Sequence, residues 1–320
     1  MPTDPTPNMV AGKTAAEVFA EVRAMDFRHV EFDTLKSLIG NAFIGMRTRA
    51  PMCDAGLIVY RGVGSDDKGK PNKRARVSYP PIKCATVWGR VTRPGQHVFY
   101  CSVARDAIPF ELGLRADDYV AIGRWRSTAQ LMFTQVGFNR GVLTTLGGVR
   151  AAPTWTDNSV DSLSELDLQI DEFFSEQFCK IVPRGDDYLY KVSVAIAEPL
   201  FRNAFTFGNV PGYTGLPRVA GLVFPSIAML GSADNLALLP AVADDSFCLD
   251  FIEWSYVEAS GPDVCRLKPI DCANTFGPDG EIEWNGRPPQ YTIPPGGKYT
   301  MRGSEIIEAF DAAGGRIEDS

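Results

Sequence analysis

Hydrophobic residues recur at helical spacing in the first fifty residues of the chain. Residues 13–25 carry Phe19 and Val22 among the apolar positions of one face, and residues 32–46 carry Leu35 and Ile39 in the same way. Apolar residues three and four positions apart share one face of an α-helix. We therefore expect two amphipathic helices that pack against another part of the protein.

From Leu57 onwards the pattern changes to short runs that are rich in β-branched and aromatic residues. Gly, Pro or Asp bounds each run, which is typical of strands separated by turns. The strand candidates are residues 57–60, 98–102, 119–125 and 219–224.

Helical spacing returns in two stretches between these strands. Residues 162–181 place Ile170, Phe173 and Phe174 on one face, and residues 188–201 follow the same period. The pattern of residues 250–267 predicts one or two further strands in this segment. The expected fold class is therefore α+β, with helices inserted between the strands of a sheet.

The end of the chain has a different composition. Residues 278–303 are rich in Pro and Gly, and we expect them to wrap the surface. Ser304 is an acceptable N-cap with Glu305 behind it, so a short helix is predicted to follow.

Composition narrows the class of protein. The 320 residues are 45% hydrophobic, which is enough for a sizeable core, and the net charge of −7 offers no general attraction to nucleic acid or anionic lipid. No basic region followed by an apolar run opens the chain, and nowhere do about 18 apolar residues follow one another. We expect a soluble cytoplasmic protein without nucleic-acid or membrane partners.

Cysteine and histidine usage argues against metal sites. The seven cysteines form no CxxC pair, which disfavours a disulfide framework or a thiolate zinc site and fits a reducing cytosol. His29 and His97 are the only histidines, and HExxH is absent. His97 is predicted to be a packed or edge histidine, because it adjoins a strand pattern.

Several other motifs do not fit their usual chemistry. Residues 64–70 have the spacing GxxxxGK, but Pro71 follows where a phosphate-binding loop needs Ser or Thr and the start of a helix. The basic residues within 68–76 lack interleaved aromatics and predict a solvated loop. The pairs Asp117-Asp118 and Asp186-Asp187 are interpreted as turn or cap residues, and no serine lies in GxSxG.

Four local motifs occur in an order that carries more information. The first is VYRG at 59–62, a strand ending in Arg61. The second, WGRVTRPGQHVFY at 88–100, contains Arg90 and a strand ending in Tyr100. The third, ARDAIPFE at 104–111, ends in Glu111. The fourth, AGLVFPS at 220–226, ends in Ser226, with NLAL at 235–238 behind it.

In this order the motifs resemble the RES domain, a family known as toxins of bacterial toxin–antitoxin pairs with an ADP-ribosyltransferase-like fold. The resemblance covers about residues 57–251. It implies a mixed-sheet core domain of the ADP-ribosyltransferase type at 53–258, an N-terminal helical extension at 1–52, and a C-terminal extension at 259–320 packed on the core. Thr92 and Arg93 depart from the asparagine and proline of the family pattern. The resemblance therefore does not predict the shape of the loop after Arg90 or its contacts with a ligand.

The resemblance implies NAD⁺ as substrate, without a metal. Cleavage of the nicotinamide–ribose bond builds positive charge on the ribose, and Glu111 is the expected catalytic carboxylate. Arg61 is the expected anchor of the pyrophosphate, with Arg90 second. Tyr100 is expected to stack on the nicotinamide or bond near it, and Ser226 to make one hydrogen bond in the cleft.

Each of these residues also has a structural interpretation. Arg61 could pair with an acidic neighbour, Tyr100 could belong to the core, Ser226 could cap the next segment, and Glu111 could be an exposed carboxylate.

Three functions remain open at this point. The first is an NAD⁺ glycohydrolase or phosphorylase, the second a protein ADP-ribosyltransferase, and the third a non-catalytic binding module that has kept the fold. A toxin of this kind implies an antitoxin protein that covers the active site, and the terminal extensions could mediate homo-oligomer formation.

Overall fold

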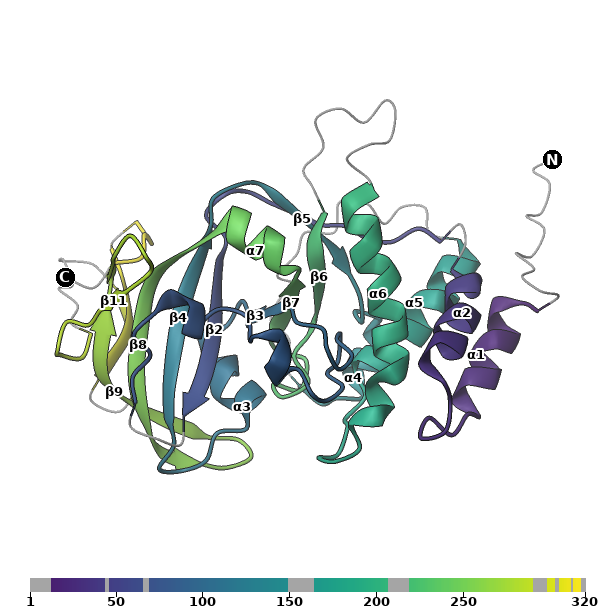
Figure 1. Cartoon of the computed structure of the whole chain (residues 1–320), viewed down its shortest axis with the longest axis horizontal. Coiled ribbons are helices and arrows are strands. Elements are labelled where there is room, and N and C mark those ends of the chain that lie inside the picture. Colours follow the sequence, from purple (N-terminus) through teal and green to yellow (C-terminus); the bar gives the residue numbers. More distant parts are fainter. Residues whose placement is uncertain are drawn as a thin grey trace. The chain divides into compact units, whose positions relative to one another are not determined.

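The computed structural model describes residues 13–43, 46–65, 69–148, 164–206, 219–289, 298–302, 305–311 and 313–317. The strands of its largest sheet are β1 (Met52–Cys53), β2 (Ile58–Ser65), β3 (Phe99–Ser102), β4 (Tyr119–Ser127), β5 (Leu131–Gln135), β6 (Val219–Pro225), β7 (Asp234–Leu238), β8 (Phe247–Ser260) and β9 (Cys265–Ala273) (Figure 1). Their order is β1-β5-β6-β7-β3-β2-β4-β8-β9. Strands β5 and β6 run parallel, whereas β6, β7 and β3 pair antiparallel, so the sheet is mixed.

Helices are inserted between these strands, which confirms the predicted α+β class. The α-helices are α1 (Ala15–Arg23), α2 (Phe32–Ala42), α3 (Ile108–Leu112), α4 (Arg140–Thr144), α5 (Glu165–Phe178), α6 (Lys191–Thr206) and α7 (Pro240–Ser246). Short 3₁₀ helices are η1 (Arg74–Arg76), η2 (Ile82–Cys84), η3 (Arg105–Ala107) and η4 (Asp187–Tyr190).

The chain divides into two compact units. The first comprises Met1–Arg61, Ser78–Glu111 and Trp125–Cys248, and the second comprises Gly62–Val77, Leu112–Arg124 and Leu249–Ser320. Strands β2, β4 and β8 each pass from one unit into the other. The division into segments 1–52, 53–258 and 259–320 stays a prediction.

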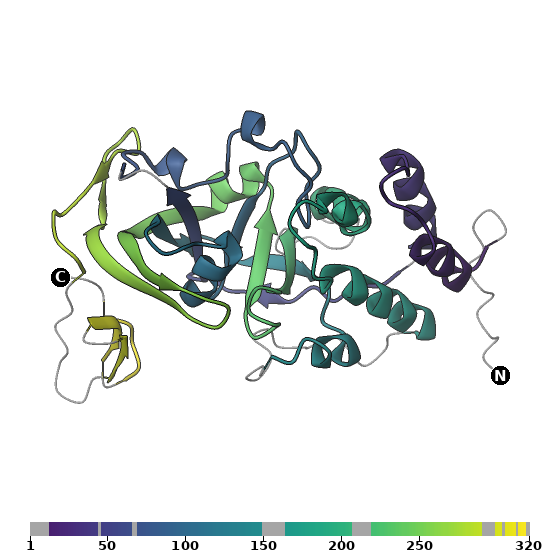
Figure 2. The same cartoon turned by 90° about the horizontal axis from the view of Figure 1, so that it is seen from below.

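The N-terminal helices pack onto the first unit as their apolar faces predict. Helix α1 begins with a capping box, in which the Thr14 hydroxyl accepts from the backbone N–H of Glu17 and the Glu17 carboxylate accepts from the N–H of Thr14. The ring of Phe19 stacks on Phe173 of α5 with 4.2 Å between centroids. Helices α1 and α2 lie side by side in both views (Figures 1 and 2).

Helix α6 packs against strand β6 and forms the centre of the core in the first unit (Figure 1). Val194 and Ile196 of α6 are fully buried, and so are Leu222 and Phe224 of β6. Full burial of such a side chain stabilises the fold by roughly 1.5–3 kcal/mol. Packing in the core therefore holds β6 in place, and Ser226 directly follows this strand.

Antiparallel pairing of β3 with β7 decides which side chains share a face. Tyr100 lies opposite Ala237, and Ser102 lies opposite Asn235. Residues directly opposite each other project to the same side of a sheet, and so do residues two apart in one strand. Tyr100 and Asn235 therefore project to the same face.

Strand β2 extends further than the hydrophobic pattern predicts. It continues through Gly62 to Ser65, so Arg61 lies inside it and not at its end. Strand β3 spans Phe99–Ser102, close to the predicted 98–102, so Tyr100 is an interior residue. The motif-based predictions that Arg61 and Tyr100 end their strands were therefore wrong.

In the second unit, β8 and β9 form an antiparallel hairpin, which confirms the strands predicted for residues 250–267. The lysine of the GxxxxGK spacing, Lys70, forms an ion pair with the buried Asp271 of β9. The indole N–H of Trp284 donates to the carbonyl of Pro71 at 2.9 Å. Residues 66–68 lie outside the described residues, and the first helical turn after them is the 3₁₀ helix η1.

The helix predicted after Ser304 was wrong. Ser304 itself lies outside the described residues, and Glu305–Phe310 form strand β13, antiparallel to β12 (Lys298–Arg302). Two β-branched residues, Ile306 and Ile307, favour the extended backbone in this segment. The Pro- and Gly-rich stretch before it includes a second short ladder, β10 (Thr275–Phe276) with β11 (Ile282–Glu283).

Within the described residues, no helix combines the length and apolar character that crossing a membrane requires. All seven cysteines lie in the described part of the chain, and each is a free thiol.

Candidate active site

Glu111 is bound by three neutral donors. Helix α3 follows β3 closely along the chain and turns Glu111 back towards that strand. Oε1 accepts hydrogen bonds from Ser226 Oγ at 2.5 Å and from Asn235 Nδ2 at 2.7 Å, and Oε2 accepts one from the Tyr100 hydroxyl at 3.2 Å. The carboxylate is therefore held in one orientation, without an ion pair to any described residue. It is not the exposed carboxylate that one interpretation of the sequence predicted.

Asn235 connects two members of this cluster. Its Nδ2 donates to Glu111 and also lies 2.8 Å from the Tyr100 hydroxyl oxygen, to which it donates. Asn235 is 1% exposed, and its Oδ1 is a buried acceptor that has no hydrogen-bond partner among the described residues. An unsatisfied buried acceptor costs about 1–3 kcal/mol, and a donor on a bound ligand would remove this cost.

Ser226 has two roles. Its hydroxyl accepts from the backbone N–H of Met229 at 3.2 Å and donates to Glu111. The side chain is fully buried directly after β6, where the sequence placed it. Ser226 therefore caps the segment that follows it and also contacts Glu111, while its part in a ligand site stays a prediction.

The ring of Tyr100 packs in the core, and its hydroxyl belongs to the Glu111 cluster. The ring lies 5.7 Å from that of Phe224. Burial, followed by the negative charge of Glu111, raises the pKa of Tyr100 well above 10.0. The hydroxyl therefore keeps its proton at neutral pH and remains a donor to Glu111.

Arg61 has no acidic partner among the described residues. Its Nε donates to the carbonyl of Ser78 at 2.6 Å, and its Nη1 donates to the carbonyl of Tyr100 at 2.5 Å. The guanidinium carbon lies 5.7 Å from the centroid of the Phe99 ring. Burial lowers the pKa of Arg61 to about 10, so the group is still a cation at neutral pH. A partly buried cation with no acidic partner among the described residues favours an anionic ligand.

Tyr100 links Arg61 to Glu111. Its carbonyl accepts from the guanidinium of Arg61, while its hydroxyl donates to the carboxylate of Glu111. The two predicted residues thus bond to opposite ends of one tyrosine, without an ion pair between them. Tyr60 pairs with Ser102, so the neighbouring Arg61 projects to the other face of the sheet from Tyr100, where its guanidinium lies against Phe99.

Arg90 is engaged at the end of a helix. Its Nη1 donates to the carbonyl of Phe178, and both Nη atoms lie 3.4 Å from the carbonyl of Lys180. The guanidinium also lies 5.3 Å from the ring centroid of Tyr190. Cations commonly satisfy carbonyls at the C-terminus of a helix such as α5. The charge of Arg90 partly opposes the rise in the pKa of Tyr100, but its hydrogen bonds are made to the carbonyls at the helix end.

The loop after Arg90 closes through its own hydrogen bonds. The N–H of Gly89 donates to the carbonyl of Thr92 at 2.8 Å, and the N–H of Gln96 donates to the carbonyl of Arg93 at 3.0 Å. The N–H of Arg93 donates in turn to Gln96 Oε1 at 3.3 Å. Thr92 and Arg93 are therefore compatible with a closed turn at this position.

The remaining sequence candidates occupy structural positions. His97 Nδ1 bonds to the carbonyl of Pro80 at 2.9 Å, and its ring lies edge-on to Tyr79. Asp118 accepts from the N–H of Arg115 in a turn at 2.7 Å. In the part of the chain that the structure describes, no three His, Cys, Asp or Glu side chains gather as a metal site would require.

Comparisons of the chain with protein-family models, with curated proteins and with solved structures find no match. The resemblance to the RES domain therefore remains a prediction from the motifs. The case for a functional site depends on the geometry of Glu111, Tyr100, Ser226, Asn235 and Arg61.

Asn235 is the member of the cluster to which the sequence analysis gave no role. A signal existed, because Asn235 is a polar amide at the start of an apolar strand that is buried throughout. Buried amides in strands usually have a specific hydrogen-bonding partner.

Proposed function

We propose that the protein consumes NAD⁺ by breaking its nicotinamide–ribose bond, with Glu111 as the catalytic carboxylate and Arg61 as the anchor of the dinucleotide. The observation that carries the proposal is the link through Tyr100. Among the described residues, this tyrosine joins a carboxylate held by neutral donors to a partly buried cation with no acidic partner.

The carboxylate suits the charge that develops in this reaction. As the bond between ribose C1 and the pyridine nitrogen breaks, its electron pair leaves with nicotinamide and positive charge builds on the ribose. Tyr100, Ser226 and Asn235 orient Glu111 without supplying a cation that would compete with the ribose. A fixed negative charge at this position stabilises the transition state more than the uncharged ground-state sugar.

The guanidinium of Arg61 suits the other end of the substrate. Its Nε and Nη1 are bound to backbone carbonyls, which fix the plane of the group, while its Nη2 has no partner among the residues described. A pyrophosphate would supply the missing negative charge through charge-assisted hydrogen bonds. Arg61 would thereby contribute to binding more than to bond cleavage.

Water is the acceptor that we place first, giving ADP-ribose and a proton. Phosphate would instead give phosphorylated ADP-ribose, and a protein side chain would give an ADP-ribosylated protein. The purified full chain is incubated with NAD⁺, with and without phosphate, and the products are resolved by chromatography. We expect release of nicotinamide. ADP-ribose recovered on protein would indicate a transferase.

Arg61→Gln separates binding from chemistry. We expect KM for NAD⁺ to rise about tenfold or more with a smaller change in kcat, because a charge-assisted hydrogen bond contributes about 1.5–3 kcal/mol. Arg23→Gln is the matched control, since Arg23 pairs with Glu176 at the surface of the same unit. Intact NAD⁺ in every reaction, with NAD⁺ still bound by the wild type, would support a non-catalytic binding module instead.

A further inference from the structure

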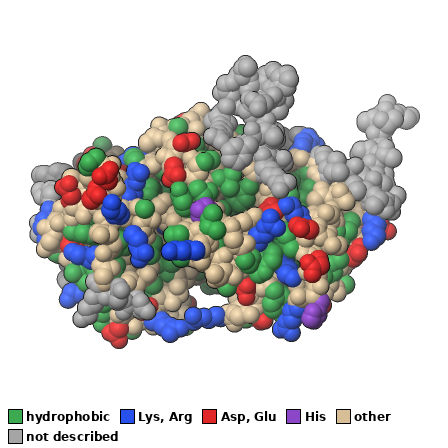
Figure 3. Space-filling view, in the orientation of Figure 1, with side chains coloured by type: hydrophobic (Ala, Val, Ile, Leu, Met, Phe, Trp, Pro, Cys, Tyr) green, Lys and Arg blue, Asp and Glu red, His purple; other side chains and the backbone are tan. Residues whose placement is uncertain are grey.

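A separate cavity of about 400 Å³ lies in the first unit. Its size is at the lower end of the range for small-molecule sites. Figure 3 shows hydrophobic side chains around a hollow between α6 and α7. The apolar part of its wall consists of Val91, Val98, Phe201, Leu239 and Pro240.

The cavity lies at one end of the β3–β7 ladder. The last pair of this ladder is Phe99 with Leu238, and the lining residues Val98 and Leu239 adjoin that pair along the chain. No member of the Glu111 cluster is among the described residues that line the cavity.

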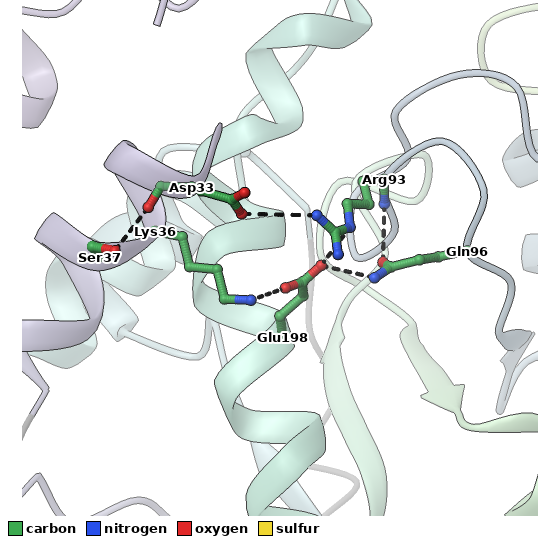
Figure 4. A network of polar contacts seen from close by, with 6 residues as sticks. All are labelled: Asp33, Lys36, Ser37, Arg93, Gln96 and Glu198. Carbon is green, nitrogen blue, oxygen red and sulfur yellow. Dashed lines mark hydrogen bonds and ion pairs between the residues drawn. The ribbon is translucent and has the colours of Figure 1, made fainter. Parts of the chain in front are cut away.

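One polar side of the cavity is built around Glu198 of α6. Its carboxylate accepts from Lys36 and from Gln96 Nε2 at 2.8 Å, and it pairs with Arg93 Nε at 3.0 Å (Figure 4). Burial opposes ionisation of Glu198, but the hydrogen bonds from Lys36 and Gln96 and the two cations outweigh it and lower the pKa. Two cations thus share the one buried carboxylate, and Arg93 has a second, exposed acidic neighbour in Asp33.

Arg93 has hydrogen-bonding capacity left over. Its second acidic neighbour, Asp33, is 3.9 Å from Nη1 and its side chain is 88% exposed, so water screens that pair. The guanidinium carbon lies 5.4 Å from the ring centroid of Phe32, which fixes its position. Arg93 lines the cavity, so its outer nitrogens can serve a ligand.

His97 also lines the wall. Because the carbonyl of Pro80 can only accept, Nδ1 of His97 donates to it, and Nε2 has no partner among the described residues. His97 lies four positions after Arg93 in the sequence, and both residues line the cavity.

We propose that this cavity binds a small carboxylic acid with an apolar body, at a site distinct from that of the dinucleotide. The carboxylate pairs with Arg93, and the body packs against Val98 and Leu239. The outer nitrogens of Arg93 match one carboxylate group, whereas the second charge of a phosphate dianion would increase the repulsion from the carboxylate of Glu198. A cationic ligand would meet two cations already in place.

The test measures binding to the full chain by isothermal titration calorimetry, with hexanoate and hexanamide as probes. The two molecules share one apolar body and differ in charge. We expect saturable binding of hexanoate that is about tenfold or more tighter than binding of hexanamide, and a loss of this preference in Arg93→Gln. Arg23→Gln should retain it, although Arg23 makes a comparable ion pair and lies 5.4 Å from the Phe173 ring centroid.

Leu239→Trp is a second variant that keeps the whole charge network. The larger side chain fills the cavity, and we expect both probes to lose affinity. Glu111→Gln should bind hexanoate as the wild type does, so this result is independent of whether the protein consumes NAD⁺. Equal affinity for the two probes, absence of saturable binding, or displacement of hexanoate by NAD⁺ would each overturn the proposal.

Discussion

The side-chain amide of Asn235 donates to Oε1 of Glu111 across 2.7 Å, although 124 positions separate the two residues in the sequence. The β3–β7 ladder brings them together, because Asn235 lies opposite Ser102 on the face to which Tyr100 also projects. The orientation of the carboxylate therefore depends on the register of two central strands.

Asn235 gives the first prediction. In Asn235→Asp the new carboxyl group lies at hydrogen-bonding distance from that of Glu111. Ionising both groups at this distance is costly, so one of the two pKa values rises. We expect the acidic limb of the kcat–pH profile for NAD⁺ turnover to move to higher pH, whereas Asn235→Ala should lower kcat without this movement. Identical profiles for Asn235→Asp and the wild type would show that the amide does not act on Glu111.

Tyr100→Phe removes the third donor to Glu111 and keeps the ring in the core. Because Ser226 and Asn235 still hold the carboxylate, we expect kcat to fall about tenfold and stability to change by about 1 kcal/mol. The matched control is Tyr79→Phe. The Tyr79 hydroxyl donates to Asp244 at 2.8 Å, and neither residue belongs to the cluster. Equal kcat values for the two variants would assign Tyr100 to the core alone.

Gly221→Ala tests the strand that positions Ser226. A Cβ atom at residue 221 would lie 2.1 Å from the carbonyl oxygen of Ala237, which is far inside van der Waals contact. We expect a loss of several degrees in Tm, because β6 and β7 would have to separate. Gly40→Ala in α2 meets no atom within 4 Å and should raise stability by about 0.5–1 kcal/mol. An unchanged Tm for Gly221→Ala would contradict the close pairing of β6 with β7.

The Glu198 network predicts a pH dependence of stability. The folded-state pKa of Glu198 is lowered from 4.5, so the unfolded chain binds the proton more tightly. Its stabilisation is then fully present above about pH 4.5 and is lost as the pH falls through the folded-state value. The Tm difference between wild type and Glu198→Gln should shrink over this acidic range. Glu176→Gln, which breaks the more exposed pair with Arg23, should cost at most about 1 kcal/mol at neutral pH. A Glu198 difference that stays constant with pH would contradict the account.

Local patterns in the sequence predicted the four longest of the described helices and about half of the described strands. Apolar spacing located α1, α2 and α5, and β-rich runs located β2, β3, β4 and β6, because these signals depend on neighbours along the chain. The segment after Ser304 carries a cap signal, yet pairing with β12 makes Glu305–Phe310 a strand. Tertiary pairing of this kind is not visible from local sequence.

The candidate site was predictable in part. The motifs named Tyr100, Glu111 and Ser226, and the structure brings these three together. Asn235 could not be assigned, because its role depends on the register of β3 with β7. The helix-end partners of Arg90 could not be foreseen either, since they belong to a segment about ninety positions further along the chain.

Nicotinamide release from NAD⁺ tests the central claim most directly. Wild type, Glu111→Gln and the control Glu176→Gln are compared at equal concentration, with folding checked by circular dichroism. We predict steady release by the wild type and the control, and a loss of at least about a hundredfold in Glu111→Gln, as expected when a transition-state charge partner is removed. Release by Glu111→Gln at the wild-type rate, or none by the wild type, would contradict the proposed function.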